Sequence, residues 1–202
     1  RSSDLSNGGL VTKALMLTLR ELGIENIVDL LIFVAVPQIG TPQALGALLH
    51  GFGQGIPDTL PFLALPEIMR AFGKNMPGAY GLIPSTEYFK TVTDPVLVFD
   101  KSMNTTRYTV TSSTTLFNFL NGNDGRIQTS LQDLSSPAIL ENYFLSYAED
   151  MHRAIDAWRP PEEMRVIQIA GWGNDTVKGI HYYKGPKRGQ YTTYFRPLFT
   201  SD

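Results

Sequence analysis

Cysteine is absent from this chain of 202 residues, which excludes disulfides and thiolate metal sites. No excess of one charge exists either: 17 Lys and Arg residues face 19 Asp and Glu residues, so the basic footprint of nucleic-acid binding is missing. The apolar run at residues 27–37 is too short to span a membrane and contains Asp29. Without a His-Glu-x-x-His pattern or a carboxylate cluster, the sequence predicts neither a metal nor a cofactor.

What the chain does contain is 43% hydrophobic residues, in patterns typical of an α/β protein. Helical spacing places Leu10, Val11, Leu15 and Leu22 on one apolar face, with Lys13 toward the other. Residues 27–36 are almost entirely apolar or β-branched, as in a strand buried on both faces of a parallel sheet. Residues 164–170 predict a second such strand, and we expect the two to pair in parallel.

The sequence between these strands is irregular and rich in proline. It predicts short helices from Pro42 to Leu49, from Pro66 to Phe72 and over 113–120, a longer helix over 136–158, a strand over 95–99 and a loop over 75–80. Residues 180–194 predict a hairpin. We interpret residues 57–160 as a mobile cap or lid, hinged at glycines 51–55, between core segments 1–56 and 161–202 of one domain.

The motif with the most chemical content is Ser6-Asn7-Gly8-Gly9, which runs directly into the first predicted helix. A serine before small residues and a helix is typical of a nucleophile elbow, where a sharp turn exposes the hydroxyl. The preferred pattern is G-x-S-x-G, and Asp4 replaces its first glycine here. The alternative is that Ser6 only caps the helix.

The stretches at residues 6–11 and 36–44 resemble the lecithin:cholesterol acyltransferase-like branch of the α/β-hydrolases. Residues 75–84, 152–158 and 171–176 resemble that branch in the same order. The resemblance implies an α/β-hydrolase-type parallel sheet, incomplete at both ends of this chain, with an inserted cap. It also implies that Ser6 is the nucleophile and that the backbone N–H of Asn7 forms half of an oxyanion hole. The triad acid and histidine are then expected beyond residue 202.

A nucleophilic serine needs a histidine to take its proton and an acid to orient that histidine. His50 is expected at a helix end, where a positive side chain suits the helix dipole, and His152 is expected to pack or hydrogen bond at the sheet surface. His181 is interpreted as a strand-surface residue, although only it comes late enough for the chain order of a hydrolase triad. Asp175 follows a core strand and is a candidate acid or a turn residue, and Asp202 is the other candidate acid.

These residues favour acyl transfer: Ser6 attacks an ester carbonyl, and water or an alcohol releases the acyl group. The expected partner is an apolar ester or lipid, with peripheral membrane contact as a further option and no nucleic acid. The chain by itself is expected to be inactive. The alternative is a lipid- or partner-binding module on a degenerate hydrolase scaffold, suggested by Asp4, Leu5 and the missing triad histidine. The sequence contains no indication of compartment.

Overall fold

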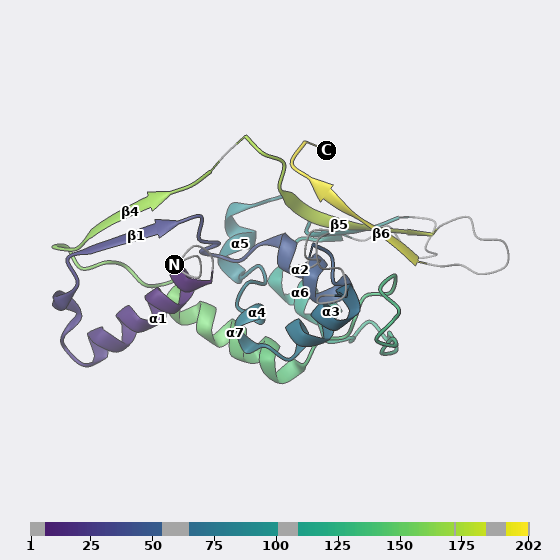
Figure 1. Cartoon of the computed structure of the whole chain (residues 1–202), viewed down its shortest axis with the longest axis horizontal. Coiled ribbons are helices and arrows are strands. Elements are labelled where there is room, and N and C mark those ends of the chain that lie inside the picture. Colours follow the sequence, from purple (N-terminus) through teal and green to yellow (C-terminus); the bar gives the residue numbers. More distant parts are fainter. Residues whose placement is uncertain (1–6, 54–64, 101–108, 172, 185–192, 202) are drawn as a thin grey trace.

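The computed structural model describes residues 7–53, 65–100, 109–171, 173–184 and 193–201. Its fold is mixed α/β, and Figure 1 shows α1 (Gly8–Glu21), β1 (Leu30–Val34) and β4 (Arg165–Ile169) together at one end. The other helices are the 3₁₀ turn η2 (Glu25–Ile27), α2 (Pro42–His50), α3 (Pro66–Lys74), α4 (Pro77–Tyr80), α5 (Thr86–Thr91), α6 (Ser113–Leu120) and α7 (Asn142–Ile155). The other strands are β2 (Leu97–Phe99), β3 (Thr109–Val110), β5 (Val177–Lys184) and β6 (Thr193–Phe199).

The strands form two small sheets. β1 and β4 pair in parallel, with Ile32 opposite Ile167, which confirms the predicted parallel pairing. The second sheet has the order β3-β2-β5-β6, in which β2 and β5 are parallel and the other two pairs are antiparallel. The pairing of β5 with β6 confirms the predicted hairpin, and residues 185–192 of its turn lie outside the described part. No hydrolase fold is identified by this arrangement alone.

Burial divides the described residues into two hydrophobic clusters. The large cluster contains 18 buried residues from the region of α2, α4–α7, β2, β3 and β5, among them Leu49, Leu97 and Phe119. The small cluster contains four, Met16, Phe33, Trp158 and Met164, beneath β1 and α1. The prediction that residues 27–36 and 164–170 are buried on both faces is wrong, because Ile32 is 53% exposed and every residue of β4 is exposed. Among the described helices, α1 packs against one face of this sheet, and Ile32 lies exposed on the strand β1.

The helices follow local signals in most places. Thr41 accepts a hydrogen bond from the backbone N–H of Gln43 at the start of α2, as an N-cap should. α1, α3 and α6 lie where expected, but α7 begins six residues later than the predicted helix over 136–158. Residues 77–80 form the one-turn helix α4, so their prediction as loop is wrong. The predicted hinge at 51–55 is described only to residue 53.

The loop before α7 is held by a buried arginine. Arg70 on α3 is 2% exposed, and its guanidinium donates to five backbone carbonyls, those of Leu49, Ser130, Leu131, Asp133 and Ser136. The distances run from 2.7 Å at Leu131 to 3.4 Å at Ser136. The two terminal nitrogens of Arg70 contribute four N–H groups to these five acceptors, so at least one N–H is shared between two carbonyls. Arg70 therefore fixes residues 130–136 in space without any regular secondary structure.

Candidate functional site

The predicted nucleophile Ser6 lies outside the described residues, as do Asp4, Leu5 and the candidate acid Asp202. The site can be followed from Asn7, the residue before α1. The side-chain amide of Asn7 donates to the Gly78 carbonyl over 3.1 Å, and its own carbonyl accepts from the N–H groups of Leu10 and Val11. Backbone N–H groups at a helix start have no partner within the helix, which suits the predicted oxyanion role of the Asn7 N–H.

The start of α1 approaches the end of β1 very closely. A Cβ at Gly9 would overlap both methyl carbons of Val36, so only glycine permits this helix position. The buried face of α1 consists of Gly9, Leu10, Lys13 and Met16. The prediction that Leu15 lies on the core face and Lys13 away from it is therefore wrong. Burial lowers the pKa of Lys13, while the Asp156 carboxylate opposes that shift.

Asp175, the other candidate acid, is exposed in the connection between β4 and β5. Its carboxylate accepts from the Thr200 hydroxyl over 3.4 Å, and Thr200 also bonds to the backbone of Thr176. These contacts tie the start of β5 to the end of β6. They suit the turn interpretation of Asp175, while its candidacy as a triad acid remains a prediction.

The three histidines have different surroundings. His50 does end α2, but it is 2% exposed and neutral, with Nδ1 2.8 Å from the Leu134 carbonyl and Nε2 2.8 Å from the Tyr182 hydroxyl. Burial lowers its pKa to about 4, so the expected positive charge at a helix end is wrong at neutral pH. His181 lies on β5, half-buried, and its Nδ1 accepts from the Arg196 side chain over 3.4 Å.

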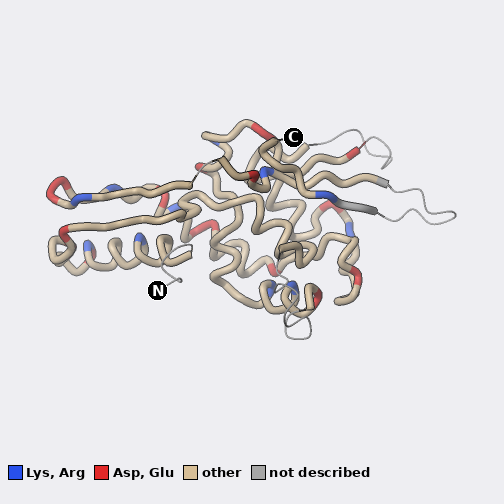
Figure 2. The backbone as a smooth tube through the Cα atoms, turned by 45° about the horizontal axis from the view of Figure 1, so that its top comes forward, with Lys and Arg blue, Asp and Glu red and all other residues tan. Residues whose placement is uncertain are grey.

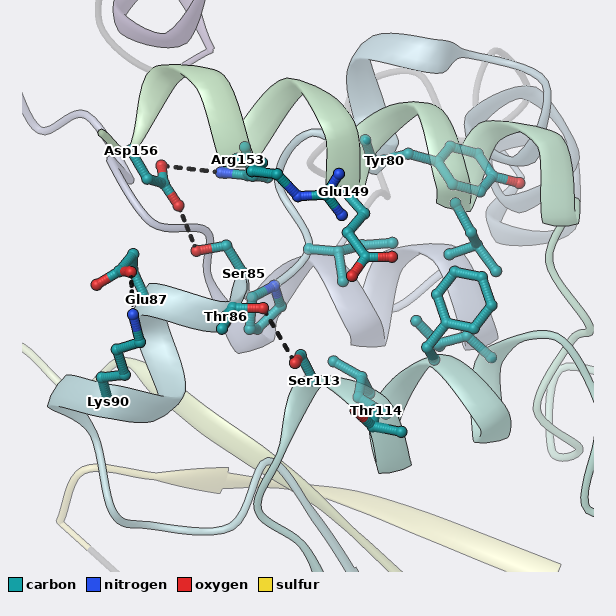
Figure 3. A pocket seen from close by; sticks show the side chains of 18 of the residues that line it. Tyr80, Ser85, Thr86, Glu87, Lys90, Ser113, Thr114, Glu149, Arg153 and Asp156 are labelled. Atoms are coloured by element: carbon teal, nitrogen blue, oxygen red, sulfur yellow. Dashed lines mark hydrogen bonds and ion pairs between the residues drawn. The ribbon is translucent and has the colours of Figure 1, made fainter. Parts of the chain in front are cut away.

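His152 is buried on α7 between two acceptors and not at a sheet surface. Its Nδ1 lies 3.1 Å from Asp156 Oδ1, and its Nε2 donates to the Gly81 carbonyl over 2.8 Å. The Gly81 carbonyl can only accept, so Nε2 is the nitrogen that donates there. The second carboxylate oxygen accepts from the Ser85 hydroxyl over 2.6 Å, and Figure 3 shows Ser85 and Asp156 directed toward each other.

Ser85, His152 and Asp156 line a pocket of about 740 Å³ between α5, α6 and α7 (Figure 3). Its apolar wall includes Tyr80, Ile83, Leu116, Leu120, Leu145 and Ala148. Three acidic side chains line the pocket, those of Glu87, Glu149 and Asp156. Three Lys and Arg side chains also line it, those of Lys90, Arg153 and Arg159. Polar side chains line the rest of the pocket, so it suits a molecule that has both apolar and polar groups and no strong net charge. Figure 2 likewise shows the two signs of charge intermixed along the described chain.

The three residues do not make a Ser-His-Asp relay, although all three residue types are present. In such a relay the histidine bridges the serine and the acid. Here Asp156 is the bridge, and Nε2 of His152 is engaged by the carbonyl of Gly81. Ser85 therefore has no histidine base in this geometry.

Sequence reasoning missed Ser85 and Asp156. The one local signal is the spacing of His152 and Asp156, four residues apart on one helix face, where side chains meet. Ser85 lies 71 residues from Asp156, so no local pattern points to that contact.

Neither metal binding nor membrane spanning is indicated within the described residues. They hold no group of three or more His, Cys, Asp or Glu arranged for a metal, and no helix among them is long and apolar enough to cross a membrane. Comparison of the chain with protein-family models, curated proteins and solved structures gives no match.

Proposed function

We propose that this chain carries the nucleophile of a serine-dependent acyl-ester hydrolase or acyltransferase, with Ser6 as that nucleophile. The observation that supports this best is the start of α1, where Gly9 lets the helix approach Val36 and Asn7 offers a backbone N–H next to Ser6. The parallel β1–β4 pair with α1 against one face is the kind of unit on which a hydrolase elbow is built. That the mixed α/β fold is a hydrolase fold is likewise part of this proposal.

In the proposed reaction, the Ser6 oxygen forms a bond to the ester carbonyl carbon as a general base removes its proton. The oxyanion that develops on the carbonyl oxygen accepts from the Asn7 N–H. The alcohol leaves with a proton and an acyl-enzyme remains. Water or a second alcohol then attacks the acyl carbon and restores the Ser6 hydroxyl. The proposed substrate is an apolar or lipid-like ester, and contact with a membrane surface is part of the same proposal.

The test is covalent labelling by a fluorophosphonate probe of the protein expressed from its complete coding sequence, because the 202-residue chain alone is expected to be inactive. Removing a triad member costs about three to six orders of magnitude in turnover. Ser6→Ala should therefore abolish labelling, and the matched control Ser146→Ala, at an exposed serine of α7, should label like the wild type. Labelling that survives Ser6→Ala would assign the nucleophile elsewhere, and a loss in Ser146→Ala would show that serine replacement alone abolishes labelling.

A second candidate function is non-catalytic binding of a partly apolar ligand, and the pocket between α5, α6 and α7 favours it. Its volume suits a small molecule, and Ser85 in its wall lacks a histidine base. A neutral environment-sensitive fluorophore should bind there and gain fluorescence. Thr114→Trp, at an exposed pocket residue, should weaken binding about tenfold by filling the space, whereas Thr111→Trp, exposed outside the pocket, should not. Equal binding by both variants would exclude this site.

A further inference from the structure

The one-turn helix α4 is held by a hydrogen bond near each end. Near its start, the Gly78 carbonyl accepts from the side-chain amide of Asn7 over 3.1 Å. Directly after its end, the Gly81 carbonyl accepts from Nε2 of His152 over 2.8 Å. The two donors come from the start of α1 and from α7, so α4 connects these two parts of the molecule.

The fit at the Asn7 end is close. A Cβ at Gly78 would lie 3.1 Å from Nδ2 of Asn7, which is tighter than an ordinary van der Waals contact. Between the two ends, α4 has little room to move, because Tyr80 is fully buried. The Tyr80 hydroxyl also donates to the Lys74 carbonyl and accepts from the Glu141 N–H. A displacement of one end of α4 should therefore also displace the other end.

His152 is held in turn by a buried polar network. Asp156 accepts from His152 and from the Ser85 hydroxyl, and the backbone N–H of Ser85 donates to the Ile39 carbonyl. Ser85 stands at the N-cap of α5, yet its side chain makes no capping bond there. The hydroxyl serves the long-range contact to Asp156 and not the local one. Satisfied buried networks of this kind fix one arrangement of the elements that carry them.

We infer that Asn7 and His152 are positioning residues for the proposed nucleophile, coupled through α4. The side chain of Asn7 is anchored on Gly78, which leaves its backbone N–H available to the oxyanion. His152, oriented by Asp156, holds the far end of the same short helix. Neither side chain touches the reacting atoms in this scheme. The inference rests on the proposed function, and it adds the residues that set the geometry next to Ser6.

The experiment is a double-mutant cycle on the full-length protein, with Asn7→Ala, His152→Ala and the double variant. The first readout is the rate of fluorophosphonate labelling at Ser6. A small misplacement of reacting groups costs up to about a hundredfold in rate, and we expect about tenfold from either single change. The double variant should be no more than about twofold slower than the slower single variant, because both changes release the same element.

Two controls separate positioning from general damage. His152→Gln keeps a side-chain N–H that can reach the Gly81 carbonyl, so it should restore labelling to within about threefold of wild type. Asn75→Ala removes a comparable bond from an asparagine amide to a helix carbonyl, that of Ala71, and should leave the rate unchanged. The free energy of unfolding is also measured for every variant, so that the coupling between Asn7 and His152 can be calculated from stability as well as from the labelling rate.

The outcomes distinguish this inference from the proposed function. If wild-type protein labels at Ser6 but the two single changes multiply in the double variant, the coupling through α4 is overturned and the proposed function stands. If wild-type protein does not label at Ser6, the proposed function fails and the positioning role fails with it. In that case the unfolding free energies still test the link between Asn7 and His152. If the losses of the two single variants add up in the double variant, the mechanical link is overturned as well.

Discussion

The two ends of this molecule bury their apolar residues to very different extents. The region of α2, α4–α7, β2, β3 and β5 encloses the large cluster of 18 buried residues, whereas α1, β1 and β4 enclose only four. Ten of the exposed large apolar residues belong to the second region: Val11, Leu15, Leu22, Ile24, Ile27, Leu30, Ile32, Val166, Ile167 and Ile169. An apolar sequence therefore does not guarantee a buried strand. Burial requires a partner layer on each face.

The largest expected difference is in the response to truncation of a leucine. Leu49→Ala in the large cluster, where the side chain is fully buried, should lower the free energy of unfolding by about 3 kcal/mol through lost burial and a cavity. Leu15→Ala on α1, where the side chain is 52% exposed, should change it by no more than about 0.5 kcal/mol. Urea denaturation measures both, and equal losses would contradict the contrast between the regions.

A loss of similar size is expected when the pH falls, and it arises at His50, which contacts Tyr182 of the large cluster. Burial lowers the pKa of His50 to about 4; the Leu134 carbonyl and Asp133 oppose the shift, and Arg70 and Arg126 add to it. The unfolded chain binds this proton near pH 6.5, so the contribution is complete above that pH and is lost between pH 6.5 and 4. The loss should be about 3 kcal/mol. In His50→Gln that pH dependence should disappear, and its persistence would assign the effect to another group.

Amide hydrogen exchange should rank the two regions directly. Few buried contacts support β1 and β4, so their amides should exchange more than about tenfold faster than those of β2 and β5. This ranking is opposite to the expectation drawn from the sequence, in which residues 57–160 form a mobile cap over a protected core. Protection of β1 above that of β2 would favour the cap interpretation.

The smallest effect on stability is expected on the uncovered sheet face, where Ile32 and Ile167 are neighbours. Replacing both by threonine keeps strand propensity and should change the free energy of unfolding by no more than about 1 kcal/mol. It should nevertheless reduce self-association, because exposed apolar strands promote pairing between chains. Light scattering measures this. The control is Ile127→Thr, at a residue outside this sheet whose side chain is 87% exposed. An equal reduction of self-association by Ile127→Thr would show that the sheet face has no special role.

The elements that the sequence predicts well are those with local signals. The residues of α6 match the expected 113–120, and the threonine cap with a following proline places the start of α2 correctly. The parallel pairing of β1 and β4 follows from their apolar character and from the crossover rule. For the two helices a few neighbouring residues contain the information, whereas the strand pairing joins segments that are far apart in the chain.

The errors arise where distant contacts decide. Ser136 and Pro137 look like a helix start, but Arg70 holds the Ser136 carbonyl, and α7 begins only at Asn142. The buried face of α1 includes Lys13, which lies near the Asp156 carboxylate, and sequence periodicity does not show that partner. The bond from Ser85 to Asp156 joins residues 71 positions apart and was not predicted. For the candidate site, Asn7 is described and Ser6 is not, so the nucleophile remains a prediction.

The buried guanidinium of Arg70 has a consequence for how this protein can change over evolution. It recognises residues 130–136 through their main-chain carbonyls, and every amino acid offers that group. Side chains in this segment can therefore be exchanged with little effect on its path, provided that the backbone conformation is kept. The constraint falls on one position of α3 instead. Lysine there would supply three donors in place of five. Among related sequences, we expect a variable loop opposite an invariant arginine.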